Sequence, residues 1–233
     1  MTREDYIHTL LTFYSPVAVL SEKNGCKVMR LRNRTTGQDM ILRSFPTAVT
    51  GYELLCRIRC GNLPEVYDVL NMTDGQIVLE EYIDGITVAQ VMETGRYRYR
   101  GAKRVLCGIC NALAVLHGNG IIHRDIKPEN VMIGKSGRVV LIDLNASRKE
   151  SESCKDTVVM GTVGYASPEQ LGIRQSDART DIYAAGVLLN VMLTGHHPTK
   201  GFARGRGGRI VRKCTSLNPD DRYQTAQKLS ATL

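Results

Sequence analysis

The sequence predicts an α+β fold with two lobes, a small β-rich lobe followed by a larger helical one. Short runs rich in β-branched and aliphatic residues, bounded by turn residues, fill most of the first third of the chain. After Gly85 the apolar residues recur at helical spacing instead. The length of 233 residues suits one large domain or two small lobes. We therefore predict a single domain over 1–233, with lobes of about 1–83 and about 84–233.

The first lobe is predicted to contain mostly strands. The expected elements are strands over 17–43, 66–69 and 76–82, and a short helix over 52–58. A turn at 35–37 interrupts the first strand region, and Asp74-Gly75 has the composition of a hairpin turn. The second lobe is predicted to be mostly helical, with helices over 87–92, 102–117 and 180–193.

The composition limits the class of protein and its partners. Hydrophobic residues make up 42% and charged residues 23%, which excludes a disordered or collagen-like chain. The most hydrophobic stretch, 182–193, is interrupted by Asn190 and is too short to cross a bilayer. The N-terminus lacks the basic flank and apolar core of a signal peptide. We therefore expect a cytoplasmic protein with no membrane partner.

The charge and the cysteines each leave two interpretations. The formal net charge of +8 favours acidic partners, and 199–209 carries four positive charges, four glycines and no acid. Two interpretations are open for this segment: a docking strip for nucleic acid or an acidic protein, or a flexible solvated loop. We favour the loop and do not expect nucleic acid as a partner, because the segment holds only one aromatic residue.

Cys107 and Cys110 have the spacing of a redox motif, but their apolar helical context favours buried thiols over a metal or redox site.

The chemistry is concentrated in one motif, His-Arg-Asp-Ile-Lys-Pro-Glu-Asn, which ends at Asn130 and is followed by an apolar run that ends at Asp143. Asp125 and Lys127 lie two residues apart on a tight loop, so a carboxylate and an ammonium can flank one reacting oxygen. Asn130 and Asp143 offer the hard oxygen ligands that Mg²⁺ prefers. Metal, charge neutralisation and an oriented hydroxyl are the requirements of phosphoryl transfer.

This motif resembles the catalytic loop of the eukaryotic-like protein kinases, specifically the serine/threonine type of bacteria. The resemblance runs in order from about residue 17 to residue 222. It implies ATP and Mg²⁺ as cofactors and a protein substrate or signalling partner. It makes Asp125 the catalytic base, Lys127 the contact to the γ-phosphate, and Asn130 and Asp143 the Mg²⁺ ligands.

The resemblance also assigns nucleotide-binding and bracing residues. Glu81-Tyr-Ile-Asp-Gly85 is similar to the hinge that binds adenine, which implies nucleotide contacts for Glu81, Ile83, Asp84 and Met132. The segment 161–169 resembles the substrate-side loop of the family, and 177–186 resembles its central buried helix.

Three further expectations concern single residues in these regions. Asp181 is expected to brace the catalytic loop, and Arg222 to pair with Glu169. Arg124 could receive a phosphate on Ser151, Ser153 or Thr157 with help from Lys149 and Lys155, although ordinary polar loop residues are an equally good interpretation. Thr162 is expected to orient Asp125.

The chain departs from the family on the nucleotide side of the small lobe. The three glycines of the phosphate loop fall at Ser21, Lys23 and Cys26, where side chains should obstruct a phosphate. Arg43 stands where the family has its phosphate-binding lysine, and a guanidinium is bulkier than an ammonium. Lys23 or Lys27 could supply the missing cation; solvated strand lysines are the alternative.

The carboxylate that normally pairs with that lysine is also displaced. Its position falls at Thr50 or Gly51. Glu53 is nearby, but two residues along a helix correspond to a rotation of about 200°, so Glu53 would face another side of the helix than Gly51. Glu80, immediately before the hinge, would be costly to bury unless it is paired. We therefore predict an Arg43–Glu80 ion pair at the back of the nucleotide pocket.

The predicted fold class is thus α+β, a two-lobed protein kinase-like fold with a small β-rich N-lobe and a larger helical C-lobe, and with shortened αC and αG regions. The intact catalytic motif favours a serine/threonine protein kinase that is slow or atypical. The altered small lobe favours the alternative, a pseudokinase that acts as a nucleotide-binding or protein-interaction module. A small-molecule phosphotransferase is a third candidate, against which the Thr-Val-Gly-Tyr and Ser-Pro-Glu elements argue.

Overall fold

The computed structural model describes residues 1–149, 164–171 and 176–233. Its contacts divide the chain into two compact units. The first unit consists of Met1–Cys60 and Pro64–Ile83, and the second of Gly61–Leu63 and Asp84–Leu233. Within the described residues, no helix is long and apolar enough to cross a membrane.

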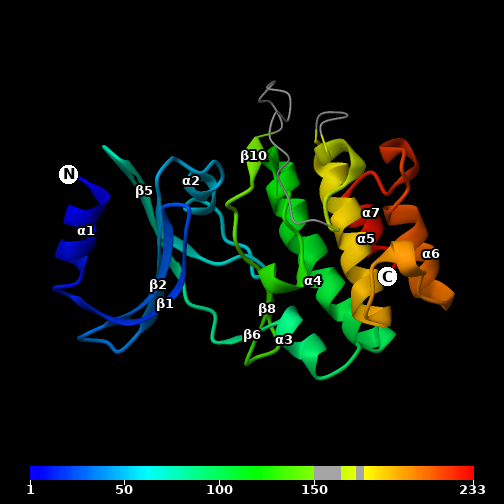
Figure 1. Cartoon of the computed structure of the whole chain (residues 1–233), viewed down its shortest axis with the longest axis horizontal. Helices are drawn as coiled ribbons and strands as arrows, with labels where there is room; N and C mark the ends of the chain where they lie inside the picture. The colour runs from blue at the N-terminus through cyan, green and yellow to red at the C-terminus, as the bar shows by residue number, and fades with distance from the viewer. Residues whose placement is uncertain (150–163, 172–175) are drawn as a thin grey trace. The chain divides into compact units, whose positions relative to one another are not determined.

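The first unit is built on a five-stranded antiparallel sheet with the strand order β1-β2-β3-β5-β4 (Figure 1). Its strands are β1 (Tyr14–Lys23), β2 (Cys26–Asn33), β3 (Asp39–Phe45), β4 (Val66–Met72) and β5 (Gly75–Glu81). The predicted strands are therefore confirmed. Asn24 and Gly25, with φ of 52° and 74°, form the two-residue turn between β1 and β2, the backbone geometry for which Asn-Gly is favoured.

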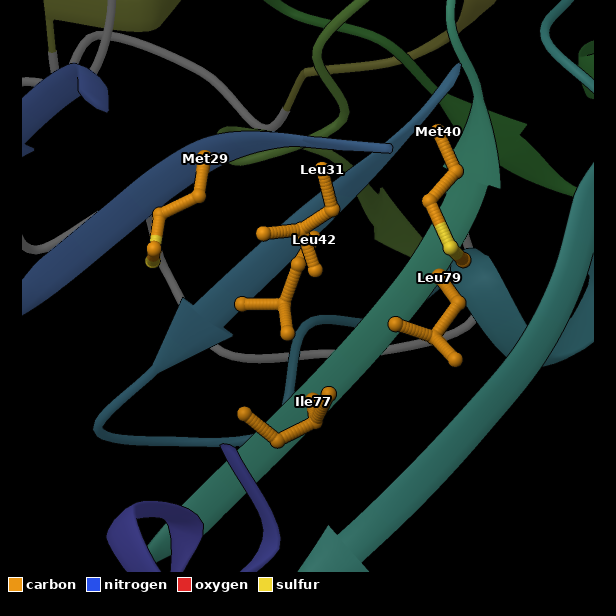
Figure 2. Packing of buried hydrophobic residues seen from close by; sticks show 6 residues of the cluster. All are labelled: Met29, Leu31, Met40, Leu42, Ile77 and Leu79. Atoms are coloured by element: carbon orange, nitrogen blue, oxygen red, sulfur yellow. The ribbon is translucent and has the colours of Figure 1, made fainter. Parts of the chain in front are cut away.

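One face of this sheet carries the apolar core of the unit. Because successive strand residues point to opposite faces, alternate residues of β2, β3 and β5 converge on one side. Figure 2 shows this cluster, formed by Met29, Leu31, Met40, Leu42, Ile77 and Leu79. Apolar residues of the N-terminal helix α1 (Arg3–Leu10), and Leu11 directly after it, pack against the cluster.

Helix α1 was not predicted from the sequence, although the sequence carries two signals for it. Thr2 and Asp5 form a capping box, in which each side chain accepts a hydrogen bond from the backbone N–H of the other residue. Tyr6, Ile7 and Leu10 have the spacing of one helix face and pack against the sheet.

The helix predicted over 52–58 is shorter in the structure, where α2 spans only Tyr52–Leu55. The chain tightens beyond it, because the N–H groups of Arg57 and Ile58 donate to carbonyls three residues back instead of four. The family's αC region is thus reduced to about one turn.

The second unit is mainly helical. Its helices are α3 (Val88–Glu93), α4 (Tyr99–Gly118), α5 (Ala178–Thr194), α6 (Gly205–Cys214) and α7 (Ala226–Ser230). Short strands pair as β6 (Gly85–Thr87) with β8 (Val131–Gly134), β8 with β9 (Val139–Leu141), and β7 (Ile121–Ile122) with β10 (Arg148–Lys149). Single 3-10 turns are η1 (Pro128–Asn130), η2 (Pro168–Leu171), η3 (Pro198–Lys200) and η4 (Pro219–Asp221). The predicted helices are confirmed, and α4, α5, α6 and α7 pack together as a bundle (Figure 1).

The expectation that 199–209 is a flexible loop is wrong for its second half, because α6 begins at Gly205. The glycines at 205, 207 and 208 lower the helix propensity of this segment, so packing must decide. Gly207 and Gly208 are buried, and a Cβ on Gly207 would lie 2.7 Å from Cδ1 of Leu193. The glycines therefore let α6 approach its neighbours closely. It is the only α-helix between α5 and the end of η4, which agrees with the shortened αG region.

Cys110 fits the interpretation as a buried thiol. It is buried in α4, and burial, with a smaller effect of Cys107, raises its pKa to about 12, so the thiol stays protonated. Cys107 is half-buried, and both thiols are free. Among the residues described, no group of three or more His, Cys, Asp or Glu side chains could hold a metal ion.

Candidate active site

The central group of the candidate site consists of three side chains from the loop between β7 and β8. Nζ of Lys127 lies 2.7 Å from Oδ2 of Asp125. Nδ2 of Asn130 donates to the same Oδ2 at 2.9 Å and to the backbone carbonyl of Asp125 at 2.8 Å. The Asp125 carboxylate is therefore oriented by an ammonium and an amide, while the Asn130 amide nitrogen is committed to this contact.

The β8–β9 hairpin brings the two predicted metal ligands to the same end of the strands. Val131 pairs with Leu141, and the N–H of Ile142 donates to the carbonyl of Asn130 at 2.9 Å. Asp143, the next residue along the chain, has a φ of 72°, which is uncommon for a residue other than glycine. Register alone thus places Asn130 beside the segment that carries Asp143. Leu144 beyond it is buried.

Asp181 holds the backbone of the loop, as predicted. It is fully buried in the first turn of α5 and accepts the N–H groups of His123 at 2.9 Å and Arg124 at 2.8 Å. Arg124 has a φ of 69°, a strained value for an arginine that such bonds can maintain. Burial opposes ionisation of Asp181, but a hydrogen bond to His117, with the charges of His117 and His123, outweighs it and lowers the pKa.

Two supporting residues were missed by the sequence analysis. Nε2 of His117 lies 2.7 Å from Oδ2 of Asp181, and Nε2 of Gln170 donates to the Arg124 carbonyl at 3.0 Å. Neither residue belongs to a motif that the sequence made visible. His117 looks like the polar end of an amphipathic helix, so only the packing of α4 against α5 reveals its contact.

The predicted pair between Glu169 and Arg222 is confirmed. Nη1 and Nη2 of Arg222 lie 2.6 and 3.0 Å from the two carboxylate oxygens of Glu169. Thr180 also donates to this carboxylate, at 3.1 Å. Burial opposes ionisation of Glu169, but the hydrogen bond and charge of Arg222, together with hydrogen bonds from the Glu169 backbone and from Ser167, outweigh it and lower the pKa of the carboxyl below its ordinary value.

The predicted pair between Arg43 and Glu80 is also confirmed. Nε of Arg43 lies 2.6 Å from Oε1 of Glu80, and the residues are 6% and 2% exposed. Register explains the contact, because Ile41 on β3 pairs with Glu80 on β5 and Arg43 is the diagonal neighbour on the same face. Glu53 is exposed instead and accepts a hydrogen bond from Asn71.

Replacing Glu80 with Gln should therefore destabilise the protein by about 1–3 kcal/mol, because the buried guanidinium loses its charged acceptor. The matched substitution Glu53→Gln should cost less than about 0.5 kcal/mol, since that carboxylate is exposed. Unfolding in urea at neutral pH measures both. Equal losses in the two variants would contradict a special role for Glu80.

The other predicted nucleotide-binding residues of the first unit lie on its sheet. Lys23 is exposed at the end of β1, beside the Asn24-Gly25 turn. Lys27 pairs with Glu22 at 3.3 Å. Glu81 ends β5, and its carboxylate accepts the N–H of Glu65 at 3.1 Å, while Ile83 is buried.

Two predicted nucleotide-binding residues belong to the second unit, because the border between the units falls inside the predicted hinge. Asp84 is exposed and pairs with Lys135 at 2.7 Å. Met132 is half-buried in β8. On the substrate side, Arg124 is buried and Lys149 exposed, whereas Lys155, Thr162 and the three candidate phosphorylation sites lie outside the described residues. Those three sites are Ser151, Ser153 and Thr157.

The fold and the loop around Asp125 define a protein kinase. Residues 20–232 match the protein kinase domain family, and the chain belongs to that family. Among curated proteins, serine/threonine-protein kinase PknB of Mycobacterium tuberculosis is 34% identical over 184 residues, covering 67% of this chain and 29% of that protein.

Two more relatives align over a greater part of the chain. PknB of Mycobacterium leprae is 34% identical over 231 residues, with 87% of this chain and 35% of that protein covered. A probable serine/threonine-protein kinase of Clostridium perfringens is 31% identical over 229 residues, with 87% and 33% covered. The resemblance to bacterial serine/threonine kinases is thus confirmed, and the chain spans about a third of the length of these relatives.

Proposed function

We propose that the chain is a serine/threonine protein kinase that transfers the γ-phosphate of ATP to hydroxyl groups of proteins. The observation that carries the proposal is the contact of Asp125 with both Lys127 and Asn130. A carboxylate held by an ammonium and an amide on one loop is suited to orient an attacking hydroxyl and accept its proton.

Each residue of the site has a role in this proposal. Asp125 accepts the proton of the substrate hydroxyl, and Lys127 offsets negative charge on the transferred group. Asn130 and Asp143 hold Mg²⁺, which supplies charge neutralisation at the phosphates when bound. Glu81, Ile83, Asp84 and Met132 contribute to the nucleotide site.

The residues fit a magnesium ion. The Asn130 amide nitrogen is engaged with Asp125, so its oxygen is the atom left to act as a ligand. Asp143 adds a carboxylate that is neither deeply buried nor fully exposed. Mg²⁺ in phosphoryl-transfer sites takes one or two protein ligands and completes its shell with phosphates and water.

The small lobe supports a second candidate function, a pseudokinase that signals through binding. The observation that supports it is the Arg43–Glu80 pair. Arg43 stands where the family has its phosphate-binding lysine, and the Glu80 carboxylate offsets the positive charge of Arg43. If the protein is catalytic, the phosphates need another cation, and the proposal assigns that role to Lys23 on the exposed end of β1.

The test is transfer of labelled γ-phosphate from Mg-ATP to the protein itself and to a generic protein substrate. We expect label for the wild type and none for Asp143→Asn. Lys23→Ala should then lower the rate more than Lys27→Ala, because Lys27 already pairs with Glu22. Absence of label with an ATP-dependent rise in melting temperature would instead establish the pseudokinase. Absence of both would overturn nucleotide binding altogether.

A further inference from the structure

Positive charge in the second unit is concentrated in two segments that lie far apart in the sequence. Residues 94–124 contain six Lys and Arg residues, and 182–219 contain another six, without a single Asp or Glu in either segment. The net charge of the whole chain is only +8, so the rest of the chain is acidic overall. The net charge of the whole chain therefore does not account for the concentration of Lys and Arg in these two segments.

The structure brings parts of these two segments together around one pocket. A cavity of about 500 Å³ is lined by Arg96 before α4, Tyr99 at its start, the end of α5, and by Phe202, Arg204 and Arg206 before and within α6. Among the residues that the structure describes, no acidic side chain lines it. Three arginines thus line one cavity together with apolar and aromatic residues.

Hydrogen bonds fix the segments that form the wall of the pocket. The backbone N–H of Tyr97 donates to the carbonyl of Met192 at 2.9 Å, which ties the segment before α4 to α5. The buried Asn190 holds the loop before α6: its amide donates to His196 and Gly201 carbonyls at 3.0 and 2.9 Å, and its oxygen accepts the Ala203 N–H at 2.8 Å. The polar residue that interrupts the apolar helix therefore fixes the shape of the cavity.

Gly195 adds a further constraint on this wall. It ends α5 with a φ of 78°, and a Cβ at this position would lie 3.1 Å from Nε of Arg96. The Arg96 side chain therefore packs against the end of α5, and it is one of the residues that line the pocket.

We propose that this pocket, which we call the arginine pocket, docks an acidic peptide segment of a partner protein, with carboxylates on the arginines and one aromatic or apolar side chain in the cavity. Arginine pairs with carboxylates through two parallel hydrogen bonds, and a cavity of this volume holds a few side chains. This inference goes beyond the proposed kinase activity and does not depend on it, because docking requires neither ATP nor Mg²⁺.

The surroundings favour a peptide over nucleic acid. Single-stranded nucleic acid needs open aromatic faces on which bases stack. Here Arg212 lies over the Phe202 ring at 4.9 Å, and the Tyr99 hydroxyl donates to the Leu233 carbonyl at 3.2 Å. The Phe202 ring therefore already has a cation over it, whereas the side chains of Arg96 and Arg204 are exposed.

The test is fluorescence anisotropy of the full chain with a fluorescein-labelled peptide that contains Glu-Glu-Phe-Glu-Glu. The Lys-Lys-Phe-Lys-Lys peptide and labelled oligothymidylate serve as comparison probes. We expect saturable binding of the acidic peptide that weakens as salt rises. Arg96→Glu with Arg204→Glu should weaken it at least about tenfold, since two charges reverse at the pocket.

The matched control reverses two charges elsewhere on the same unit, Lys213→Glu with Lys228→Glu, and should change affinity less than about threefold. Arg206 is left intact because it binds the Thr232 carbonyl near the C-terminal end. If the melting temperature of the first variant falls, Arg96→Gln with Arg204→Gln replaces it. Equal losses in pocket and control variants, tighter binding of oligothymidylate, or no saturable binding of the acidic peptide would each overturn the proposal.

Discussion

Asp125→Asn is expected to lower the rate of γ-phosphate transfer by about 10²–10⁴-fold, the usual contribution of a positioned general base. The amide that replaces the carboxylate keeps its size and can still contact Lys127 and Asn130, but it cannot accept a proton. In the native site Oδ2 of Asp125 lies 2.7 Å from Nζ of Lys127. The rate is measured with saturating Mg-ATP and a generic protein substrate.

The control for this variant is the same substitution at an exposed site, Asp68→Asn on β4. It should retain the wild-type rate, and both variants should melt within a few degrees of the wild type. A transfer rate that survives in Asp125→Asn would mean that the label comes from another group or another enzyme. It would remove the main support for the proposed function without affecting the arginine pocket.

Arg222→Ala is expected to lower the free energy of unfolding by about 3–5 kcal/mol, because it leaves a buried carboxylate without its cation. The Arg222 side chain is 0% exposed and that of Glu169 is 5% exposed. Arg222 also donates to the carbonyls of Ser216 and Arg179, at 2.8 and 3.1 Å. The loss therefore combines an unpaired charge with unsatisfied backbone acceptors. Denaturant unfolding at neutral pH measures it.

The double variant Arg222→Met with Glu169→Leu should recover a large part of this loss, because it removes the stranded charge together with its partner. A double variant as unstable as Arg222→Ala would show that the carbonyl contacts of Arg222, and not the ion pair, carry the effect.

The pH dependence of the pair follows from the lowered pKa of Glu169. A carboxyl whose pKa in the folded state lies below its ordinary value of 4.5 stabilises the fold fully above that pH, and this contribution is lost as the pH falls through the folded-state pKa. The difference in stability between the wild type and Arg222→Ala should therefore narrow below pH 4.5. A difference that stays constant would contradict an ionic origin.

The candidate site could be found from the sequence because its chemistry is local. Asp125, Lys127 and Asn130 lie within six consecutive residues, so their spacing already restricts how far apart their side chains can be. The Arg43–Glu80 pair lies 37 residues apart but was also predictable. Antiparallel register determines diagonal neighbours, and a buried carboxylate needs a cation.

Other features were visible in the sequence but were not recognised. The capping box of Thr2 and Asp5 and the apolar spacing of Tyr6, Ile7 and Leu10 predict α1 in retrospect. The sheet face that α1 covers could then have been anticipated, since the same alternation that sends Arg43 to one face sends Leu42 to the other.

The motif around Asp125 already indicated the protein kinase family by its resemblance, and apolar spacing predicted the main strands and helices but not α1, α6 or α7. The folded structure was needed to show that the glycine- and arginine-rich segment forms α6 and that Arg96 and Arg204 line the same pocket. Helix propensity argues against the first, and the second joins residues more than a hundred positions apart. Gly207 and Gly208 illustrate the reason: they lower helix propensity, but their missing side chains permit close contacts with Leu193 and Ala203 that exist only in the folded chain.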